Sequence, residues 1–140
     1  MRQNPIYLLV DDDTDDIEFF CEALQDINEK AKCFIARNGE EAISILRNMT
    51  DIKPDLIVLD LNMPKMNGKS CLRKLKSDNE LKDIPVVVYT TSANRMEKDE
   101  TLLLGAAEFM TKATSFSKLC ADILEIIKKI SKISNRNVLA

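Results

Sequence analysis

Histidine and tryptophan are both absent from the 140 residues. The four cysteines, at positions 21, 33, 71 and 120, are widely spaced, and no Cys-x-x-Cys pair occurs. Without histidine or paired cysteines, the chain lacks the ligands of the usual zinc sites and the base that commonly activates a nucleophile. We therefore expect four reduced cysteines in or near the core, which points to the cytoplasm.

Long apolar runs are missing as well. No segment approaches the roughly 18 unbroken apolar residues that a membrane span requires, and the first five residues lack the apolar stretch of a signal peptide. The net charge of −3 argues against a dedicated nucleic-acid-binding protein. The length fits one domain, and no repeat or linker divides it. We expect neither membrane nor nucleic acid among its partners.

Short apolar runs alternate with amphipathic stretches along the whole chain. The runs predict buried strands, and the stretches, whose apolar residues recur three or four apart, predict helices. Five such strand–helix units indicate an α/β fold, with a parallel sheet covered by helices on both faces. Strands are expected at 6–10, 32–36, 55–60, 86–89 and 108–111; the first helix is expected at 14–28 and the fourth at 95–104. We assign residues 1–133 to one domain, with a frayed tail at 134–140 and no output domain.

Polar side chains gather where the expected strands end. The first strand ends in Asp11-Asp12-Asp13, the third in Asp60, the fourth in Thr90 and the fifth in Lys112. Taken alone, Asp60 is more typical of a turn or a cap, but the carboxyl ends of parallel strands share one edge and can bring these residues together. Clustered carboxylates stay ionised only beside a cation, and an all-oxygen ligand set favours Mg²⁺. Such a site, with one lysine and one hydroxyl, can hold a phosphoryl group on Asp60.

Four segments resemble the receiver domain of two-component response regulators. They are Leu9-Val10-Asp11-Asp12-Asp13, Leu59-Asp60-Leu61-Asn62-Met63-Pro64 with Met66-Asn67-Gly68, Val88-Tyr89-Thr90-Thr91-Ser92, and Gly105-Ala106-Ala107-Glu108-Phe109-Met110-Thr111-Lys112. Each segment is a weak signal alone, but their order and spacing are specific and extend over nearly the whole chain. The resemblance implies a flavodoxin-like, doubly wound (βα)5 fold with strand order 2-1-3-4-5.

The resemblance also implies a role for each matching residue. Asp60 is similar to the phosphoacceptor of the family, which takes the phosphoryl group from a phosphohistidine. Mg²⁺ would be bound directly by Asp12 and Asp60, through water by Asp11, and by the backbone carbonyl of Asn62. Asn62 and Ser92 also occupy the variable positions that tune dephosphorylation in the family.

The remaining implied roles concern the phosphoryl group and the switch. Lys112 would pair with the phosphoryl group, the Thr90 hydroxyl would move toward it, and the ring of Phe109 would fill the space behind. The chain departs from the family in having Ala113 where proline usually follows a cis peptide bond, and in having no hydroxyl on the switch aromatic. A cis bond before a non-proline residue costs roughly 2.5–4 kcal/mol. The sequence therefore leaves the Lys112–Ala113 bond open between cis and trans.

The implied function is that of a single-domain response regulator. It would accept a phosphoryl group from a histidine kinase or phosphotransfer protein, and then either switch a docking face for a protein target or pass the phosphate along a phosphorelay. The fourth helix, fifth strand and fifth helix lie next to Thr90 and Phe109 and form the expected docking face. No catalysis is expected beyond its own aspartyl phosphorylation and dephosphorylation.

A Mg²⁺-dependent phosphatase of the haloacid-dehalogenase type is the alternative. Asp11 and Asp13 form the Asp-x-Asp pair of that class, which also uses a strand-end hydroxyl and a lysine. Against it, position 15 holds an aspartate where that class needs a hydroxyl, and the late acidic pair after the lysine is missing.

Other residues near these motifs have structural interpretations. Asp13, Asp15 and Asp16 are interpreted as the cap and first-turn acids of the first helix. The run Leu102-Leu103-Leu104 is interpreted as core. Gly105 is expected to end the fourth helix.

Overall fold

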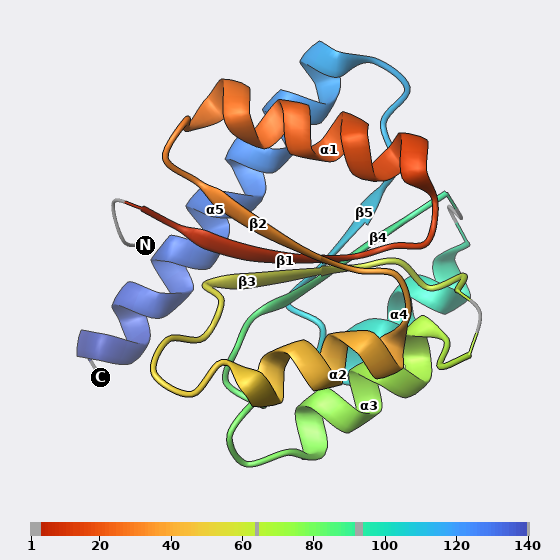
Figure 1. Ribbon diagram of the computed structural model, residues 1–140, viewed down its shortest axis with the longest axis vertical. Coiled ribbons are helices and arrows are strands. Elements are labelled where there is room, and N and C mark those ends of the chain that lie inside the picture. Colours follow the sequence, from red (N-terminus) through yellow and green to blue (C-terminus); the bar gives the residue numbers. More distant parts are fainter. Residues whose placement is uncertain (1–3, 64, 92–93, 140) are drawn as a thin grey trace.

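The computed structural model describes residues 4–63, 65–91 and 94–139, with side chains as far as residue 132. Pro64 and Ser92, which belong to the motifs above, lie outside these ranges. Within the described ranges, five parallel strands form one sheet and five helices cover it (Figure 1). The predicted doubly wound α/β fold is confirmed.

Each strand is followed by a helix, as the sequence predicts. The strands are β1 (Ile6–Val10), β2 (Lys32–Ala36), β3 (Leu56–Leu59), β4 (Val86–Thr90) and β5 (Glu108–Thr111). The helices are α1 (Thr14–Ile27), α2 (Gly39–Asn48), α3 (Gly68–Ser77), α4 (Arg95–Leu103) and α5 (Phe116–Leu139). Helix α5 continues beyond residue 133, where a frayed tail was expected to begin; the domain limits themselves stay a prediction.

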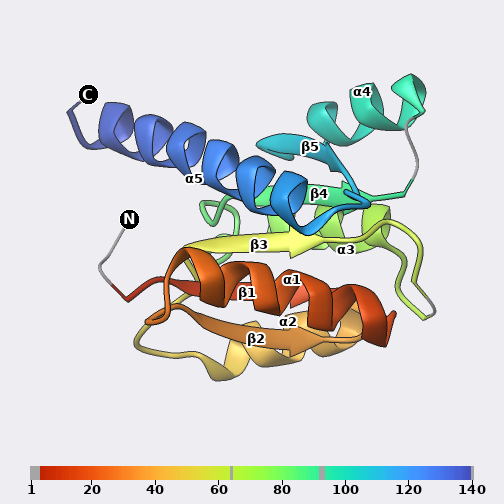
Figure 2. The ribbon, with the colours of Figure 1, turned by 90° about the horizontal axis from the view of Figure 1, so that it is seen from above.

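The central strand of the sheet is β3. The order is β2-β1-β3-β4-β5 and every neighbouring pair is parallel (Figure 2), which confirms the implied order. Helices α1 and α5 cover one face, and α2, α3 and α4 cover the other (Figure 1). Successive side chains of a strand point to opposite faces, so Ile57 and Leu59 belong to one apolar cluster, and Leu56 and Val58 to another.

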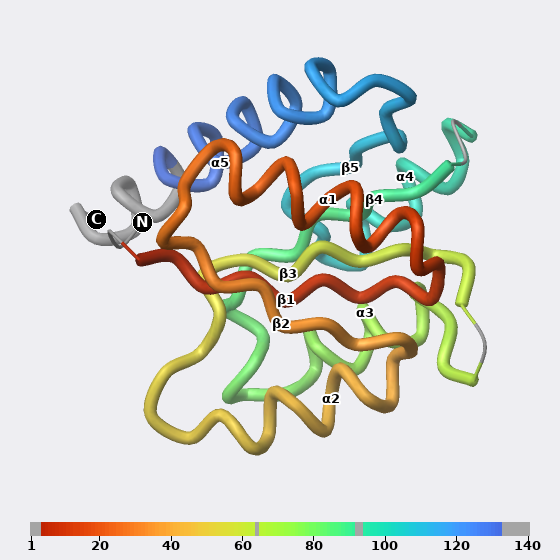
Figure 3. Tube along the Cα trace, turned by 45° about the horizontal axis from the view of Figure 1, so that its top comes forward, coloured from red at the N-terminus to blue at the C-terminus, as the bar shows by residue number. Residues whose placement is uncertain are grey.

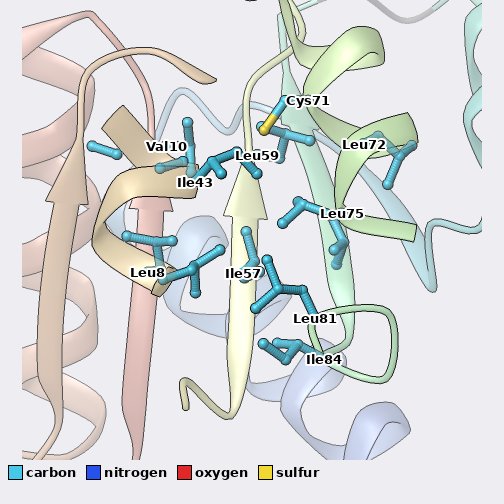
Figure 4. Close-up of a cluster of buried hydrophobic side chains, with 14 of the residues drawn as sticks. Leu8, Val10, Ile43, Ile57, Leu59, Cys71, Leu72, Leu75, Leu81 and Ile84 are labelled. Carbon is cyan, nitrogen blue, oxygen red and sulfur yellow. The ribbon is translucent and has the colours of Figure 1, made fainter. Parts of the chain in front are cut away.

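Two apolar clusters therefore hold the layers together. Figure 4 shows the cluster on the α2 and α3 side, where Ile57 and Leu59 of the central strand lie opposite Leu72 and Leu75 of α3. Burying such side chains stabilises the fold by roughly 25 cal/mol per Å² of apolar surface. Cys71 lies in this cluster, and the other three cysteines pack half-buried against the second one. All four are free, as expected.

Polar side chains fix where the first four helices begin. The carboxylate of Asp13 accepts a hydrogen bond from the backbone N–H of Asp16 at 3.0 Å. The side chains of Asn38, Asn67 and Asn94 cap α2, α3 and α4 in the same way. Such a cap contributes about 1 kcal/mol. The interpretation of Asp13 as the cap of the first helix is confirmed.

The end of α4 corrects one expectation. Leu103 is 88% exposed and Leu102 is also exposed, so their interpretation as core is wrong; only Leu104 packs partly against a cluster. Successive helical residues are about 100° apart, so three consecutive leucines cannot share one face, and the buried Thr101 takes the inward position. Gly105, with φ at 111°, follows the helix as predicted, in the left-handed region that favours glycine.

The two ends of the sheet differ in what lies there. The start of β1 lies at one end of the sheet, away from the carboxyl ends of the strands (Figure 3). The strand-end residues singled out from the sequence lie at the opposite end. None of the helices described is long and apolar enough to cross a membrane.

Candidate functional site

The sheet brings the strand-end residues to one edge. Strands β1 and β3 are neighbours, with Val10 paired to Leu59, so the residues that follow them, Asp11 and Asp60, lie side by side. The backbone N–H of Asp60 donates to the carbonyl of Val10 at 2.9 Å. On the other side of β3, β4 ends in Thr90, whose carbonyl accepts a hydrogen bond from the Lys112 backbone at 2.7 Å.

Three carboxylates meet at this edge. Asp11, Asp12 and Asp60 each place one oxygen within 4.8 Å of the others, and only Asp12 is exposed. The predicted juxtaposition of these residues is confirmed. Three anions so close repel each other unless a cation lies between them, and oxygen donors without histidine or thiolate suit a hard divalent ion. The residues present therefore fit a divalent cation, with Asp12 on the open side.

Lys112, which directly follows β5, extends into this site. The Lys112 ammonium lies 2.8 Å from Asp11, 2.7 Å from Asp16 and 3.4 Å from Asp60, and 9% of its side chain is exposed. Burial lowers the pKa of Lys112, but its hydrogen bonds to Asp11 and Asp16 outweigh that effect and hold the pKa above the ordinary value. The lysine is therefore a permanent cation at this edge.

The opposite balance holds for Asp60. Burial raises the pKa of its carboxyl group, the charge of Asp11 raises it further, and attraction to Lys112 only partly compensates. Both pKa values are raised, but this favours the charged form of Lys112 and the neutral form of Asp60. Lys112 lies closer to Asp11 and Asp16 than to Asp60, so its charge compensates the burial of Asp60 only in part. Asp60 is thus the least well neutralised of the buried carboxylates, which favours its reaction with an electrophile held beside a cation.

The hydroxyl of Thr90 is buried and its oxygen has no hydrogen-bond partner among the described residues. A buried polar atom without a partner costs free energy, so such a group in a site is suited to a ligand that supplies the missing partner. Phe109 of β5 is half-buried and packs against the cluster on the α2 and α3 side. Asn62 is exposed and borders an open groove with Asp12 and Met63.

Asp16 is the site residue that the sequence interpretation missed. It lies in the first turn of α1, as expected, but its carboxylate makes the shortest contact with Lys112. The spacing contained a signal, because Asp16 precedes the buried Phe20 by four residues and residues so spaced lie on one helix face. Asp15, its neighbour, is exposed and makes no such contact, so its interpretation as a first-turn acid is confirmed.

The departure at Ala113 has a definite geometry. The Lys112–Ala113 peptide bond is trans, since no cis bond occurs among the described residues.

The ring of Tyr89 lies under the lysine, with its centroid 5.7 Å from the ammonium nitrogen. Burial raises the pKa of Tyr89 to about 12. The phenol is therefore neutral, and the ring supports the lysine by packing and cation–π attraction.

Comparison with known proteins decides the family. The profile of the response regulator receiver domain matches residues 7–124, which includes every strand-end residue described above. The chain belongs to this family. Receiver domains are signalling modules that take a phosphoryl group from a histidine kinase, and the haloacid-dehalogenase alternative is not supported.

The receiver domain has several similar relatives. Response regulator Rcp1 of Synechocystis sp. is 33% identical over 124 residues, which cover 84% of each chain. The phosphorylated cyanobacterial phytochrome response regulator RcpA is 35% identical, with a TM-score of 0.79 over 88% of this chain and 91% of that one. The Mn²⁺-bound form of Rcp1 has a TM-score of 0.75 and is 31% identical, over 84% of this chain and 90% of that one.

Other relatives carry the receiver as one part of a longer chain. A protein-glutamate methylesterase/protein-glutamine glutaminase of Methanococcoides burtonii is 32% identical over 130 residues, which are 89% of this chain and 35% of that protein. The chain thus spans about a third of this relative. The shared part is the receiver domain.

Proposed function

We propose that the receiver domain accepts a phosphoryl group on Asp60. The observation that carries this proposal is the placement of Asp60 at the centre of the sheet edge, between the carboxylates of Asp11 and Asp12 and the ammonium of Lys112. A carboxylate oxygen of Asp60 attacks the phosphorus of a phosphohistidine on a kinase or phosphotransfer protein. The P–N bond breaks, its electron pair stays on the imidazole, and an aspartyl phosphate forms.

The cation proposed for this site is Mg²⁺. Asp12 and Asp60 would bind it directly, Asp11 through a water, and the backbone carbonyl of Asn62 would complete the protein ligands. When bound, the ion neutralises charge on the transferred group, which is its usual role in phosphoryl transfer. The solved Mn²⁺-bound form of Rcp1 supports a divalent ion in a related receiver.

Lys112 and Thr90 would stabilise the product. The ammonium of Lys112 pairs with one phosphoryl oxygen, and the hydroxyl of Thr90, which has no partner among the described residues, donates to another. Movement of Thr90 would leave space that the ring of Phe109 fills. Attack of water on the same phosphorus later releases phosphate, so the domain acts only on its own aspartyl phosphate.

The switch would change a docking face made of α4, β5 and α5. Phe109 lies on β5, and Met96 and Leu103 expose apolar side chains on α4, where an unidentified target protein can bind. Phosphorylation adds about −1.5 to −2 charges, enough to bias such a face by the 1–3 kcal/mol typical of allosteric coupling. A step in a phosphorelay fits the same chemistry.

We place this function in the cytoplasm, where the free cysteines stay reduced.

Intact mass after incubation with acetyl phosphate tests the acceptor. We expect the parent and an Asp15→Asn control to gain about 80 Da, the mass of one PO₃H unit, only with Mg²⁺. Asp60→Asn should gain nothing. An adduct that persists in Asp60→Asn would place the acceptor elsewhere, and no adduct in the parent with any phosphodonor would refute the proposal.

A further inference from the structure

The ammonium group of Lys112 makes three hydrogen bonds. An ammonium group offers three N–H donors, and Lys112 directs them to three different carboxylates. The contact with Asp16 is the shortest at 2.7 Å, and the contact with Asp60 is the longest at 3.4 Å. Asp16 is not one of the three clustered carboxylates that could hold a cation, so its contact with the lysine is separate from that cluster.

The position of Asp16 is fixed by the start of α1. Its backbone N–H donates to the capping carboxylate of Asp13 at 3.0 Å, and the Asp13 N–H donates in turn to Asp11 at 3.0 Å. One turn later, Phe20 is buried and packs against Tyr89, with ring centroids 5.3 Å apart. The helix therefore presents the Asp16 carboxylate to the site from a rigid support.

From this geometry we infer that Asp16 is a positioning residue for phosphoryl transfer, and that it competes with the phosphoryl group for the ammonium of Lys112. The inference rests on the proposed function of Asp60. A phosphoryl oxygen on Asp60 needs a donor from Lys112, but the donor directed at Asp60 lies 3.4 Å away, and the contact with Asp16 at 2.7 Å holds the ammonium toward α1. Movement of the ammonium toward a phosphoryl oxygen on Asp60 therefore weakens its contact with Asp16.

Two physical effects act in the same direction. Competition withholds the lysine from the charge that develops on the transferred oxygens, and the negative charge of Asp16 repels an incoming phosphate dianion. Asp16 is 38% exposed, so water moderates both effects. The variant Asp16→Asn keeps the shape of the side chain and removes the charge, so that Asp11 and Asp60 become the only charged partners of Lys112 in this group.

Three variants separate these two effects from the general effect of losing an acid in the first turn of α1. Asp16→Asn removes the charge and leaves only a neutral amide oxygen as an acceptor for Lys112. Asp16→Glu keeps a carboxylate that can reach Lys112, and Asp15→Asn removes the adjacent first-turn charge. Both Asn variants lose one acid from the first turn of α1, so they share any effect of the helix dipole. Thermal melts show whether each variant is folded.

The first readout is the rate of phosphoryl uptake from acetyl phosphate at saturating Mg²⁺. We expect Asp16→Asn to react about three- to fivefold faster than the parent. This is the change in rate that corresponds to the loss of one partly exposed ion pair. Asp16→Glu should stay near the parent rate, and Asp15→Asn should change it by less than about twofold. Equal rates in the two Asn variants, or a slower rate in Asp16→Asn, would overturn the inference.

The second readout needs no phosphorylation. The ¹⁵N-correlated signal of the Lys112 ammonium, assigned by its loss in Lys112→Met, should be sharp in the parent, in Asp15→Asn and in Asp16→Glu, and shifted or broadened in Asp16→Asn. An unchanged signal in Asp16→Asn would show that Asp16 does not hold the lysine. If the signal changes in Asp16→Asn but the parent takes up no phosphoryl group, the proposed function is wrong and the contact between Asp16 and Lys112 is still supported. If the parent is phosphorylated and Asp16→Asn and Asp15→Asn react at the same rate, only the inference about Asp16 is wrong.

Discussion

At the scale of single residues, Asp60 combines burial with incomplete neutralisation. It is 6% exposed, and the lysine that faces it lies closer to two other carboxylates. Burial therefore raises the pKa of Asp60, and the charged form opposes folding when no cation is present. A buried carboxylate that is incompletely neutralised therefore lowers the stability of the metal-free domain.

Replacement of Asp60 by asparagine should stabilise the metal-free domain. In the presence of a chelator at neutral pH, we expect Asp60→Asn to raise the free energy of unfolding by about 1 kcal/mol, because the variant removes a buried charge and keeps the shape. Urea unfolding followed by circular dichroism measures it.

The same pair of proteins should show a defined pH dependence. Because the folded-state pKa of Asp60 is above its ordinary value of 3.8, the folded protein binds the proton more tightly than the unfolded chain. The stability that this proton contributes is complete below 3.8 and is lost as pH rises through the folded-state pKa. The advantage of Asp60→Asn should therefore shrink on acidification through that window, and an advantage that grows there would contradict the burial argument.

At the scale of elements, the connection from β3 to α3 positions the site most tightly. The N–H of Gly68 donates to the carbonyl of Leu61 at 3.0 Å, which folds the start of α3 back onto the end of β3. A Cβ at Gly68 would lie inside the contact distance of the Asp60 and Leu61 backbones. Glycine is required there by the close approach of two backbones.

Gly68→Ala should therefore affect both stability and the cation site. We expect a loss of about 2 kcal/mol or more, because the added methyl group forces the loop away from Asp60. Titration with Mn²⁺, followed by electron paramagnetic resonance, should show weaker binding in the folded variant. Ser70→Ala, two residues further into α3, is the matched control, and similar losses in both variants would argue against the close approach as the cause.

At the scale of the whole molecule, the fold assembles the site from distant parts of the chain. Asp60 lies 49 positions after Asp11 in the sequence, so the unfolded chain contains no comparable group of carboxylates. A ligand that binds only the folded state stabilises it by mass action. The cation and the fold should consequently support each other.

Mg²⁺ should raise the melting temperature of the domain. At a concentration ten times the dissociation constant, the gain is about 1.4 kcal/mol, or roughly 4 °C for a chain of this length. Asp12→Asn should lose most of this gain with little effect on the metal-free protein, because Asp12 is exposed. Asp15→Asn should keep the gain. Calorimetry with Mg²⁺ and with a chelator measures both, and a full gain in Asp12→Asn would exclude Asp12 as a ligand.

Local patterns in the sequence determined the element order and the residues at the strand ends. Short apolar runs and the polar residues that follow them can be recognised in the sequence without knowledge of tertiary contacts, because strand burial and capping are local requirements. They located the ends of β1, β3, β4 and β5, and hence Asp11, Asp60, Thr90 and Lys112. The strand order and the proposed residue roles came from the resemblance to receiver domains rather than from the patterns.

Only the tertiary structure decided how these residues share their contacts. The pairing of Asp16 with Lys112, 96 positions away, depends on how α1 packs beside the sheet. The exposure of Leu103 depends on which face α4 turns toward β5, and the trans bond before Ala113 depends on the path of the loop after β5. These are properties of side-chain direction and loop path, which hydrophobic periodicity does not specify. They decide which carboxylates contact the lysine and which apolar side chains of α4 are exposed.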